Sequence, residues 1–253
     1  MAILSPRRTS KKSTFDIVAN SEFVLGRQTR PGPEANLVEQ FLLDLPFGAH
    51  RDCRITVFRE PRLQSGFPDL VAVLWHEPTT KRWDEARAGI SANDVRLVHL
   101  LASHGPRDEE HLAHMFQQRL KPLLRRLAAL GLIYECGGFW QASDLSRCFA
   151  VRKIIAFEAK VSDWRAGLRQ ASLNRWFASE SYVLLPCVRN QKDLLDEAQA
   201  LGVGVWIAGD LQPLLRSSSS CAPQPVSYAS WLFNEWSWRC AVANGHREQQ
   251  VRC

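Results

Sequence analysis

The sequence has no apolar stretch long enough to span a membrane, and its first residues lack the apolar core of a secretory signal. Its seven cysteines are an odd number and are scattered without Cys-x-x-Cys spacing. His111 and His114 have the spacing of metal ligands, but no second ligand pair lies near them, which favours a surface position. We therefore expect a cytoplasmic protein with reduced thiols, no zinc site and no membrane partner.

What is present is enough apolar material for a globular protein, together with an excess of basic residues. The 253 residues, 45% of them hydrophobic, can form one sizeable domain and a small one. The formal charge is +6, and residues 1–30 hold six basic residues against two acidic ones. We expect these thirty residues to form a basic mobile tail, whose charge adds nonspecific attraction to phosphates.

Two short apolar segments, residues 69–75 and 152–160, have the composition of buried central strands. Asp69 begins the first, and Glu158 and Lys160 end the second on one face, because side chains alternate along a strand. Charges at the ends of core strands are costly unless they bind a cation or a partner. Two carboxylates and a lysine at neighbouring strands suit a magnesium ion and an activated water. The alternative is a surface Glu158–Lys160 ion pair with Asp69 in a turn.

The pair of motifs Pro68-Asp69 and Glu158-Ala159-Lys160 resembles the PD-(D/E)XK nuclease superfamily, which includes restriction endonucleases, Holliday junction resolvases and RecB-like exonucleases. The resemblance implies an α/β fold of the restriction-endonuclease type, with a mixed β-sheet flanked by helices. It also implies hydrolysis of DNA phosphodiester bonds with Mg²⁺, or Mn²⁺ as the alternative. The implied metal ligands are Asp69, Glu158 and the backbone carbonyl of Ala159, and Lys160 is implied to act on the attacking water.

Two further residues match helper positions of that superfamily. Glu34 lies on the inward face of an amphipathic helix predicted within residues 30–42. The superfamily often carries a glutamate on its first core helix that aids metal binding, although a glutamate near a helix N-terminus is also favoured by the helix dipole. Gln170, on a helix predicted over residues 164–177, resembles the glutamine with which many members orient the site.

Asp69 and Glu158 are 89 positions apart, whereas a direct hairpin normally joins these strands in the superfamily. Something is therefore inserted. The intervening sequence indicates a winged helix-turn-helix. Three helices are predicted over residues 93–102, 108–116 and 121–130, and a hairpin over residues 132–142, which contains Gly137-Gly138.

The third helix of this insertion is basic, with four Lys or Arg and no acid between residues 117 and 130, and this charge suits a polyanion. Residues 91–150 as a whole have seven basic and six acidic residues, so docking of a protein partner stays open. Two arginines after Lys160 are candidates for phosphate contacts or for a solvated basic face. The candidate DNA contacts are Arg119, Lys121, Arg125, Arg126, Arg165 and Arg169.

We divide the chain at the composition shifts into a tail, two halves of a nuclease core, an insertion and a C-terminal segment. The boundaries are 1–30, 31–88, 89–150, 151–216 and 217–253. The last part joins a serine-rich linker to a tryptophan-rich segment, residues 231–239, expected to be a helix packed on the core, with base stacking as the alternative.

The expected function is a magnesium-dependent deoxyribonuclease of repair, restriction or phage defence. The alternatives are a non-catalytic winged-helix regulator of DNA and a protein-docking module. A homodimer would suit the cutting of both strands.

Overall fold

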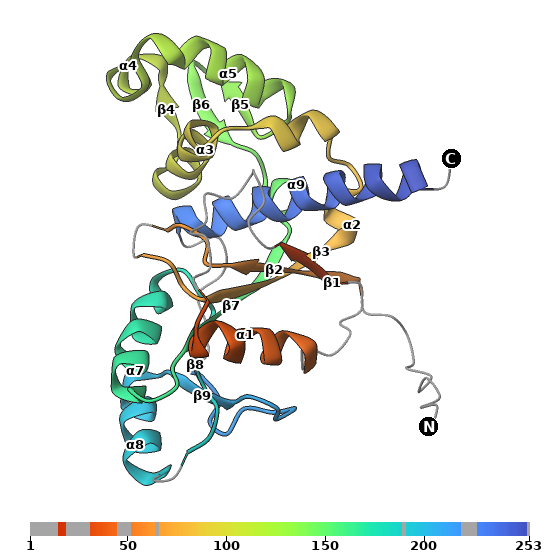
Figure 1. The fold of residues 1–253 in the computed structure, drawn as a ribbon. Helices are drawn as coiled ribbons and strands as arrows, with labels where there is room; N and C mark the ends of the chain where they lie inside the picture. The colour runs from red at the N-terminus through yellow and green to blue at the C-terminus, as the bar shows by residue number, and fades with distance from the viewer. Residues whose placement is uncertain are drawn as a thin grey trace.

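The computed structural model describes residues 15–18, 31–44, 52–63, 66–188, 191–218 and 227–251 (Figure 1). Its centre is a mixed six-stranded sheet in the order β1-β2-β3-β7-β8-β9. β3 runs antiparallel to both β2 and β7, and the other neighbours are parallel. The strands are β1 (Phe15–Val18), β2 (Cys53–Arg59), β3 (Leu70–His76), β7 (Val151–Ala159), β8 (Glu180–Leu185) and β9 (Gly204–Ile207). The predicted α/β class, with an open mixed sheet flanked by helices, is confirmed.

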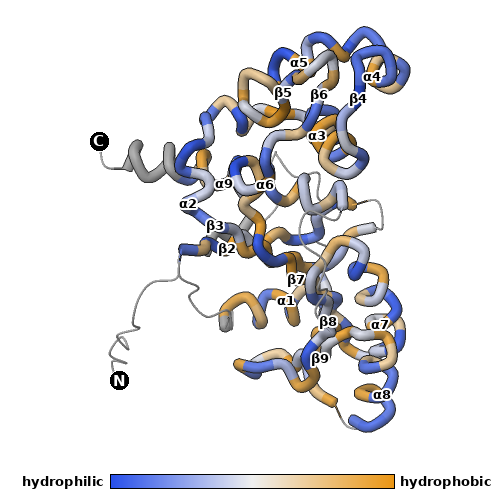
Figure 2. The backbone as a smooth tube through the Cα atoms, turned by 180° about the vertical axis from the view of Figure 1, so that it is seen from behind, coloured by the Kyte–Doolittle hydropathy of each residue, from blue (hydrophilic) through white to orange (hydrophobic). Residues whose placement is uncertain are grey.

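Helices cover both faces of the main sheet, because the side chains of its central strands are apolar on both sides. Figure 2 shows hydrophobic residues along β7. On one face, Phe157 of β7 packs against Phe41, with ring centroids 5.0 Å apart. On the other face, Ala156 lies in the core beneath the C-terminal helix, and Val183 of β8 meets Leu168. The helices concerned are α1 (Pro33–Asp44) on the first face, and α7 (Trp164–Leu173), α8 (Gln191–Leu201) and α9 (Tyr228–Val251) on the second.

Between β3 and β7 the chain leaves the main sheet and forms a separate unit, residues 91–149, here termed the inserted module (Figure 1). It holds four α-helices, one 3-10 turn and a three-stranded sheet in the order β4-β6-β5. Its elements are α3 (Ala92–His104), β4 (Arg107–Asp108), α4 (Glu109–Phe116), η2 (Gln117–Arg119), α5 (Leu120–Ala129), β5 (Ile133–Cys136), β6 (Phe139–Ala142) and α6 (Leu145–Cys148). Two short helices precede it, α2 (Glu77–Thr80) and η1 (Glu85–Gly89).

Local sequence explains where these elements begin and end. Ser91 and Asp94 form a capping box at the start of α3. Gly131 ends α5 with φ of 66°, a conformation that favours glycine. Gly137 and Gly138 have φ of 61° and 82°, which suits the tight turn between β5 and β6.

A buried ionic contact joins α9 to the chain that leads into the inserted module. The Arg87 guanidinium donates to both carboxylate oxygens of Glu235, at 2.8 and 2.6 Å, and to the carbonyl of Cys148 at 2.6 Å. The two side chains are only 2% and 4% exposed. Asn234 accepts a hydrogen bond from the N–H of Ala150 at 2.8 Å. Both chain segments that connect module and sheet are thus held by one helix, which lies between the two units (Figure 1).

Aromatic packing holds the same helix on the sheet. Trp231 is buried against Phe149, with centroids 5.0 Å apart, and Phe233 is buried against Phe58 at 5.4 Å. The prediction of a tryptophan-rich helix packed on the core is confirmed. A buried Trp231 is inaccessible for stacking on bases.

Two expectations about where secondary-structure elements begin and end were wrong. Within residues 1–30, Phe15–Val18 is not a tail, because it pairs in parallel with β2, Phe15 opposite Ile55. The rest of that range lies outside the described residues. The helix expected over 164–177 ends at Leu173 and continues as a 3-10 turn, η3 (Asn174–Trp176), since Asn174 is held by a buried partner described below.

No helix among the described residues is long and apolar enough to cross a lipid bilayer. None of the five described cysteines, which include Cys148 and Cys240 in the core, forms a disulfide.

Removing one partner of the Arg87–Glu235 pair should strongly destabilise the fold, because the other charge is left buried. We expect Glu235→Leu to lower the free energy of unfolding by about 3–5 kcal/mol. The double variant Arg87→Met/Glu235→Leu should cost less than either single change. Urea unfolding followed by tryptophan fluorescence measures both. The matched control is the exposed pair Arg165–Glu197, 2.9 Å apart, where Glu197→Leu should cost less than about 1 kcal/mol. Equal losses at the two pairs would contradict the assignment.

Candidate functional site

Asp69 and Glu158 lie opposite each other on adjacent strands, as the sequence predicted. The register pairs Leu70 with Phe157, so the next position along each strand places Asp69 beside Glu158. Both then fall on the face covered by α7 and α9. The Asp69 carboxylate accepts a hydrogen bond from the N–H of Ala159 at 2.8 Å. This contact joins two parts of the chain that lie 90 positions apart and holds the two acids side by side.

Lys160 and Glu34 meet at the same end of the sheet. The N–H of Lys160 donates to the carbonyl of Leu184 at 3.0 Å, which extends the pairing of β7 and β8 by one residue. Its Nζ lies 3.2 Å from Oε1 of Glu34, with side chains 16% and 48% exposed. Glu34 stands in the first turn of α1. Three separate segments, the start of β3, the end of β7 and the start of α1, therefore bring the predicted acids and the predicted lysine together.

Burial and mutual repulsion make the two carboxylates hard to ionise together. Glu158 is 6% exposed, and burial together with the charge of Asp69 raises its pKa to about 8. A hydrogen bond from Asn174 and the charge of Lys160 oppose this rise. Burial also raises the pKa of Asp69, against the N–H of Ala159 and the charge of Lys160. At neutral pH and without a cation, the pair therefore holds a proton.

A third acid, which the sequence analysis missed, adjoins this pair. Glu60 is 6% exposed, follows β2 and donates its N–H to the carbonyl of Asp69 at 3.1 Å. Its charge contributes to the raised pKa of Asp69. Its φ of 43° is uncommon for a residue with a side chain. Glu60 could have been identified from the hairpin that β2 and β3 form. Glu60 follows the first strand and Asp69 precedes the second, so the two acids lie opposite each other.

The helix residue that contacts the site is Asn174 rather than Gln170. The Asn174 amide donates to Oε1 of Glu158 at 2.7 Å, and the contact is buried. Gln170 lies on an exposed part of α7. Gly167 lets the helix lie close, since a Cβ there would stand 2.8 Å from Cγ of Lys160. The spacing of seven between Gly167 and Asn174 places both on one helix face, and this periodicity could have identified Asn174.

A cleft with a volume of about 530 Å³ opens beside the acids, between the start of α1 and the end of the sheet. Glu34, Glu60 and Asp69 line it, together with Arg59 and Ser162. Glu158 is buried behind them. Acidic side chains thus face a space open to solvent.

The donor set fits a hard divalent cation. Magnesium is held in many enzymes by one or two carboxylates, with water and backbone oxygens completing its shell. Asp69 and Glu158 supply two carboxylates. The carbonyl of Ala159 points to the same side of its strand as the N–H that Asp69 accepts. In the described part of the chain, no three His, Cys, Asp or Glu side chains converge closely enough to hold a metal by themselves. Any such site must therefore use backbone or water oxygens.

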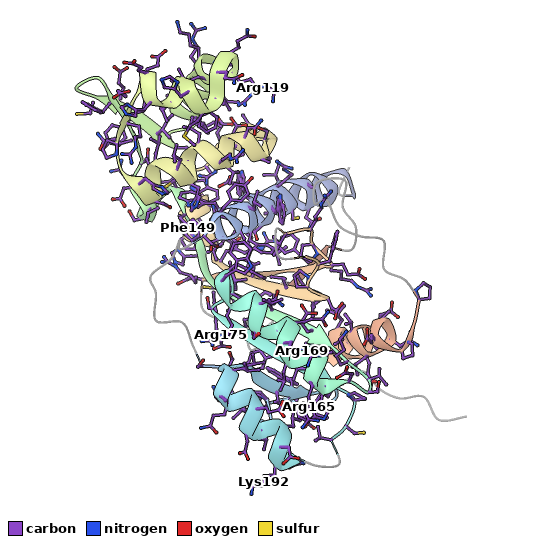
Figure 3. All side chains as sticks on the ribbon, turned by 90° about the vertical axis from the view of Figure 1, so that its left-hand side faces the viewer. Arg119, Phe149, Arg165, Arg169, Arg175 and Lys192 are labelled. Carbon is purple, nitrogen blue, oxygen red and sulfur yellow. The ribbon has the colours of Figure 1, made fainter. Side chains whose placement is uncertain are left out.

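The predicted DNA contacts occupy two separate regions (Figure 3). On α7, Arg165 pairs with Glu197 at 2.9 Å, and Arg169 is exposed. In the inserted module, Arg126 binds the buried carboxylate of Asp94 at 2.6 Å, so it serves the fold of the module. Three exposed side chains remain there for a ligand, those of Arg119, Lys121 and Arg125.

Comparison with protein-family models, curated proteins and solved structures gives no match. Function is therefore argued from the geometry of the site.

The raised pKa of Glu158 predicts a pH-dependent stability. Folding takes up a proton between the ordinary pKa of a glutamate and about 8, so the folded state binds more protons across this window. The free energy of unfolding should fall as pH rises through it, by at most about 1.4 kcal/mol per pH unit. Above the folded pKa the fall should level off. Urea unfolding in a chelator at pH values across this window measures the slope. Glu158→Gln should flatten the curve, and an unchanged slope in that variant would refute the assignment.

Replacing Asn174 should change the pKa of Glu158 and the stability of the protein, whereas replacing Gln170 should not. Asn174→Ala leaves the buried carboxylate without its donor, so its pKa should rise further. Above pH 8 the variant should lose about 1–3 kcal/mol of unfolding free energy. At pH 6 the loss should be smaller, because Glu158 is then protonated. Gln170→Ala should change stability by less than about 0.5 kcal/mol at either pH. The reverse ranking would restore Gln170 as the orienting residue.

Proposed function

We propose that the chain is a magnesium-dependent deoxyribonuclease of the PD-(D/E)XK type. The observation that carries the proposal is the convergence of Asp69, Glu158 and Lys160 beside an acidic cleft, despite 89 intervening positions. The raised pKa values of both carboxylates support it, because such acids cluster at sites that bind a cation or move protons. A surface ion pair between Glu158 and Lys160 is disfavoured, since Glu158 is buried and Lys160 is paired with Glu34.

In this proposal Asp69, Glu158 and the carbonyl of Ala159 hold the cation. When bound, magnesium supplies a water of lowered pKa and offsets the charge that develops on the phosphate. The Lys160 ammonium orients the attacking water and neutralises charge at the scissile phosphate. Glu34 fixes that ammonium through their 3.2 Å contact, and Asn174 fixes the Glu158 carboxylate at 2.7 Å. Both contacts preorganise groups that the reaction needs.

The inserted module supports DNA as the substrate. The order helix, short strand, two helices and β-hairpin, with the first strand beside the hairpin, supports the proposal that the module is a winged helix-turn-helix. In this proposal α5 and the turn before it face the DNA backbone, through Arg119, Lys121 and Arg125. Arg126 is given no such role in the proposal, because its guanidinium is bonded to Asp94. Arg169 remains as a phosphate contact beside the catalytic centre.

A second candidate is a DNA-binding regulator built on a nuclease-like sheet. Two observations favour it. Lys160 is already paired with Glu34. In addition, no three His, Cys, Asp or Glu side chains in the described part of the chain could hold a metal by themselves. Such a protein would bind DNA and leave it intact. Recruitment of a protein partner by the inserted module is the further alternative.

Cleavage assays with magnesium on linear, circular, branched and single-stranded DNA test the proposal. We expect the wild type to cut at least one of these and to lose activity in a chelator. Asp69→Asn and Lys160→Met should each reduce the rate by at least about a hundredfold, because each removes charge stabilisation at the reacting phosphate. Manganese is the second metal to test.

The matched control lies on the same strand. Lys153 belongs to β7 and pairs with Glu180 at 2.5 Å, away from the acids. Lys153→Met should leave the rate within about threefold of the wild type, in keeping with a partly exposed pair. Binding without cleavage, unaffected by Asp69→Asn, would replace the nuclease with the regulator. Cleavage that survives both substitutions would refute the catalytic centre.

A further inference from the structure

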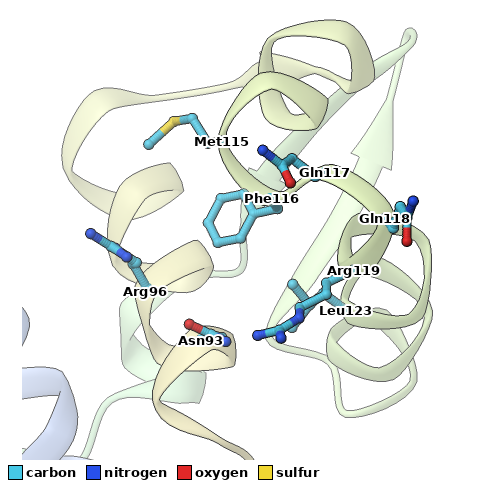
Figure 4. Close-up of a pocket in the computed structure, with 8 residues that line it drawn as sticks. All are labelled: Asn93, Arg96, Met115, Phe116, Gln117, Gln118, Arg119 and Leu123. Atoms are coloured by element: carbon cyan, nitrogen blue, oxygen red, sulfur yellow. The ribbon is translucent and has the colours of Figure 1, made fainter.

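The inserted module contains a cavity of about 580 Å³ between the start of α3 and the turn that joins α4 to α5 (Figure 4). Its volume lies in the range of small-molecule sites. Phe116 forms an apolar floor at 8% exposure, and Met115 forms part of the rim at 59%. This cavity, here termed the module cavity, is separate from the acidic cleft of the main sheet.

The polar lining of the module cavity consists of two guanidiniums and three amides, with no carboxylate. They belong to Asn93, Arg96, Gln117, Gln118 and Arg119. Across the described ranges, none of these five side chains forms a hydrogen bond or an ion pair with another residue. A site with a formal charge of +2 and free donors and acceptors fits an anion that also carries hydrogen-bonding edges.

Backbone strain marks the same place. Gln117 has φ of 49° and ψ of −134°, a conformation that favours glycine. A side chain kept in such a conformation costs stability, and residues of this kind cluster at ligand sites. Glycine would relieve the strain, yet the position carries an amide that lines the cavity.

We infer that the module cavity binds a single unpaired nucleotide of the DNA substrate. Arg96 and Arg119 take its phosphate, and the amides of Asn93, Gln117 and Gln118 bond to the edges of its base. The shape of the module cavity disfavours intact duplex DNA as its ligand. A cavity needs a ligand that projects into it, whereas paired bases are recessed in the grooves and are reached by protruding helices. A base projects only at an end, a bulge or a single-stranded stretch, or after extrusion.

This inference rests on the proposed function, because it names the kind of DNA that the nuclease prefers. It assigns the substrate choice to residues remote from the acids. Exposed Lys121 and Arg125 on α5 then supply backbone attraction that does not depend on pairing.

Binding of labelled DNA to full-length Asp69→Asn protein tests the inference without cleavage. The probes are a blunt duplex, the same duplex with a single-nucleotide bulge, and a single strand. We expect tighter binding to the bulged duplex and the single strand than to the blunt duplex. Arg96→Gln/Arg119→Gln should weaken binding of the two unpaired probes by about tenfold, the scale of one base contact. Its effect on the blunt duplex should be smaller.

Two further variants separate recognition from folding and from general charge. Gln117→Gly removes an amide and relieves strain, so it should weaken binding of the unpaired probes while the protein stays at least as stable as the parent. Arg125→Gln should weaken binding of all three probes alike. Equal effects of the cavity variants on all probes, or none, would overturn the inference. The wild type's cleavage of the same probes in magnesium is scored separately, so a missing nuclease activity is distinguishable from a missing nucleotide site.

Discussion

The buried Arg87–Glu235 contact is the constraint on which the arrangement of the molecule depends. Two charges that are almost fully shielded from water are tolerated only when every donor and acceptor is matched. Arg87 meets that condition by reaching Glu235 and the carbonyl of Cys148 together. It also stacks on Trp83, with 3.4 Å between the guanidinium carbon and the ring centroid. The contact fixes the chain on both sides of the inserted module, which limits how far the module can pivot relative to the acids of the main sheet.

The acidic centre shows how a sheet can hold charges that it would otherwise exclude. Asp69, Glu60 and Glu158 stand in one row across three strands, at the point where the apolar core ends. Asp69 and Glu158 are partly compensated, by the N–H of Ala159, by Asn174 and by the charge of Lys160. Compensation is incomplete, as the pKa of about 8 at Glu158 shows. A divalent cation would compensate the remaining carboxylate charge. Cation binding would therefore link the stability of the fold to the proposed chemistry.

The sequence predicted much of this, and its failures have physical causes. Short apolar runs with the composition of buried strands located β3 and β7, and their charged ends located Asp69, Glu158 and Lys160, because such composition is visible in a single sequence. Capping residues and glycines located the inserted module for the same local reason. Asn174 and Glu60 were missed, since their roles depend on which strand and helix lie beside them. The ion pair of Arg126 with Asp94 was also missed, because it spans 32 positions and leaves no local signal. Phe15–Val18 was assigned to the tail because the basic residues around it dominated the composition.

The interposed module also affects how the protein reaches its folded state. Asp69 and Ala159 form a direct bond across 90 positions of chain, a contact of high sequence separation. Closing so long a loop costs conformational entropy, and folding of the module first would shorten the effective distance. Helix α9, which fastens both connecting segments, is synthesised after the sheet and the module. A nascent chain that lacks α9 therefore has both connecting segments unfastened, so the module and the sheet reach their final arrangement only late in biosynthesis.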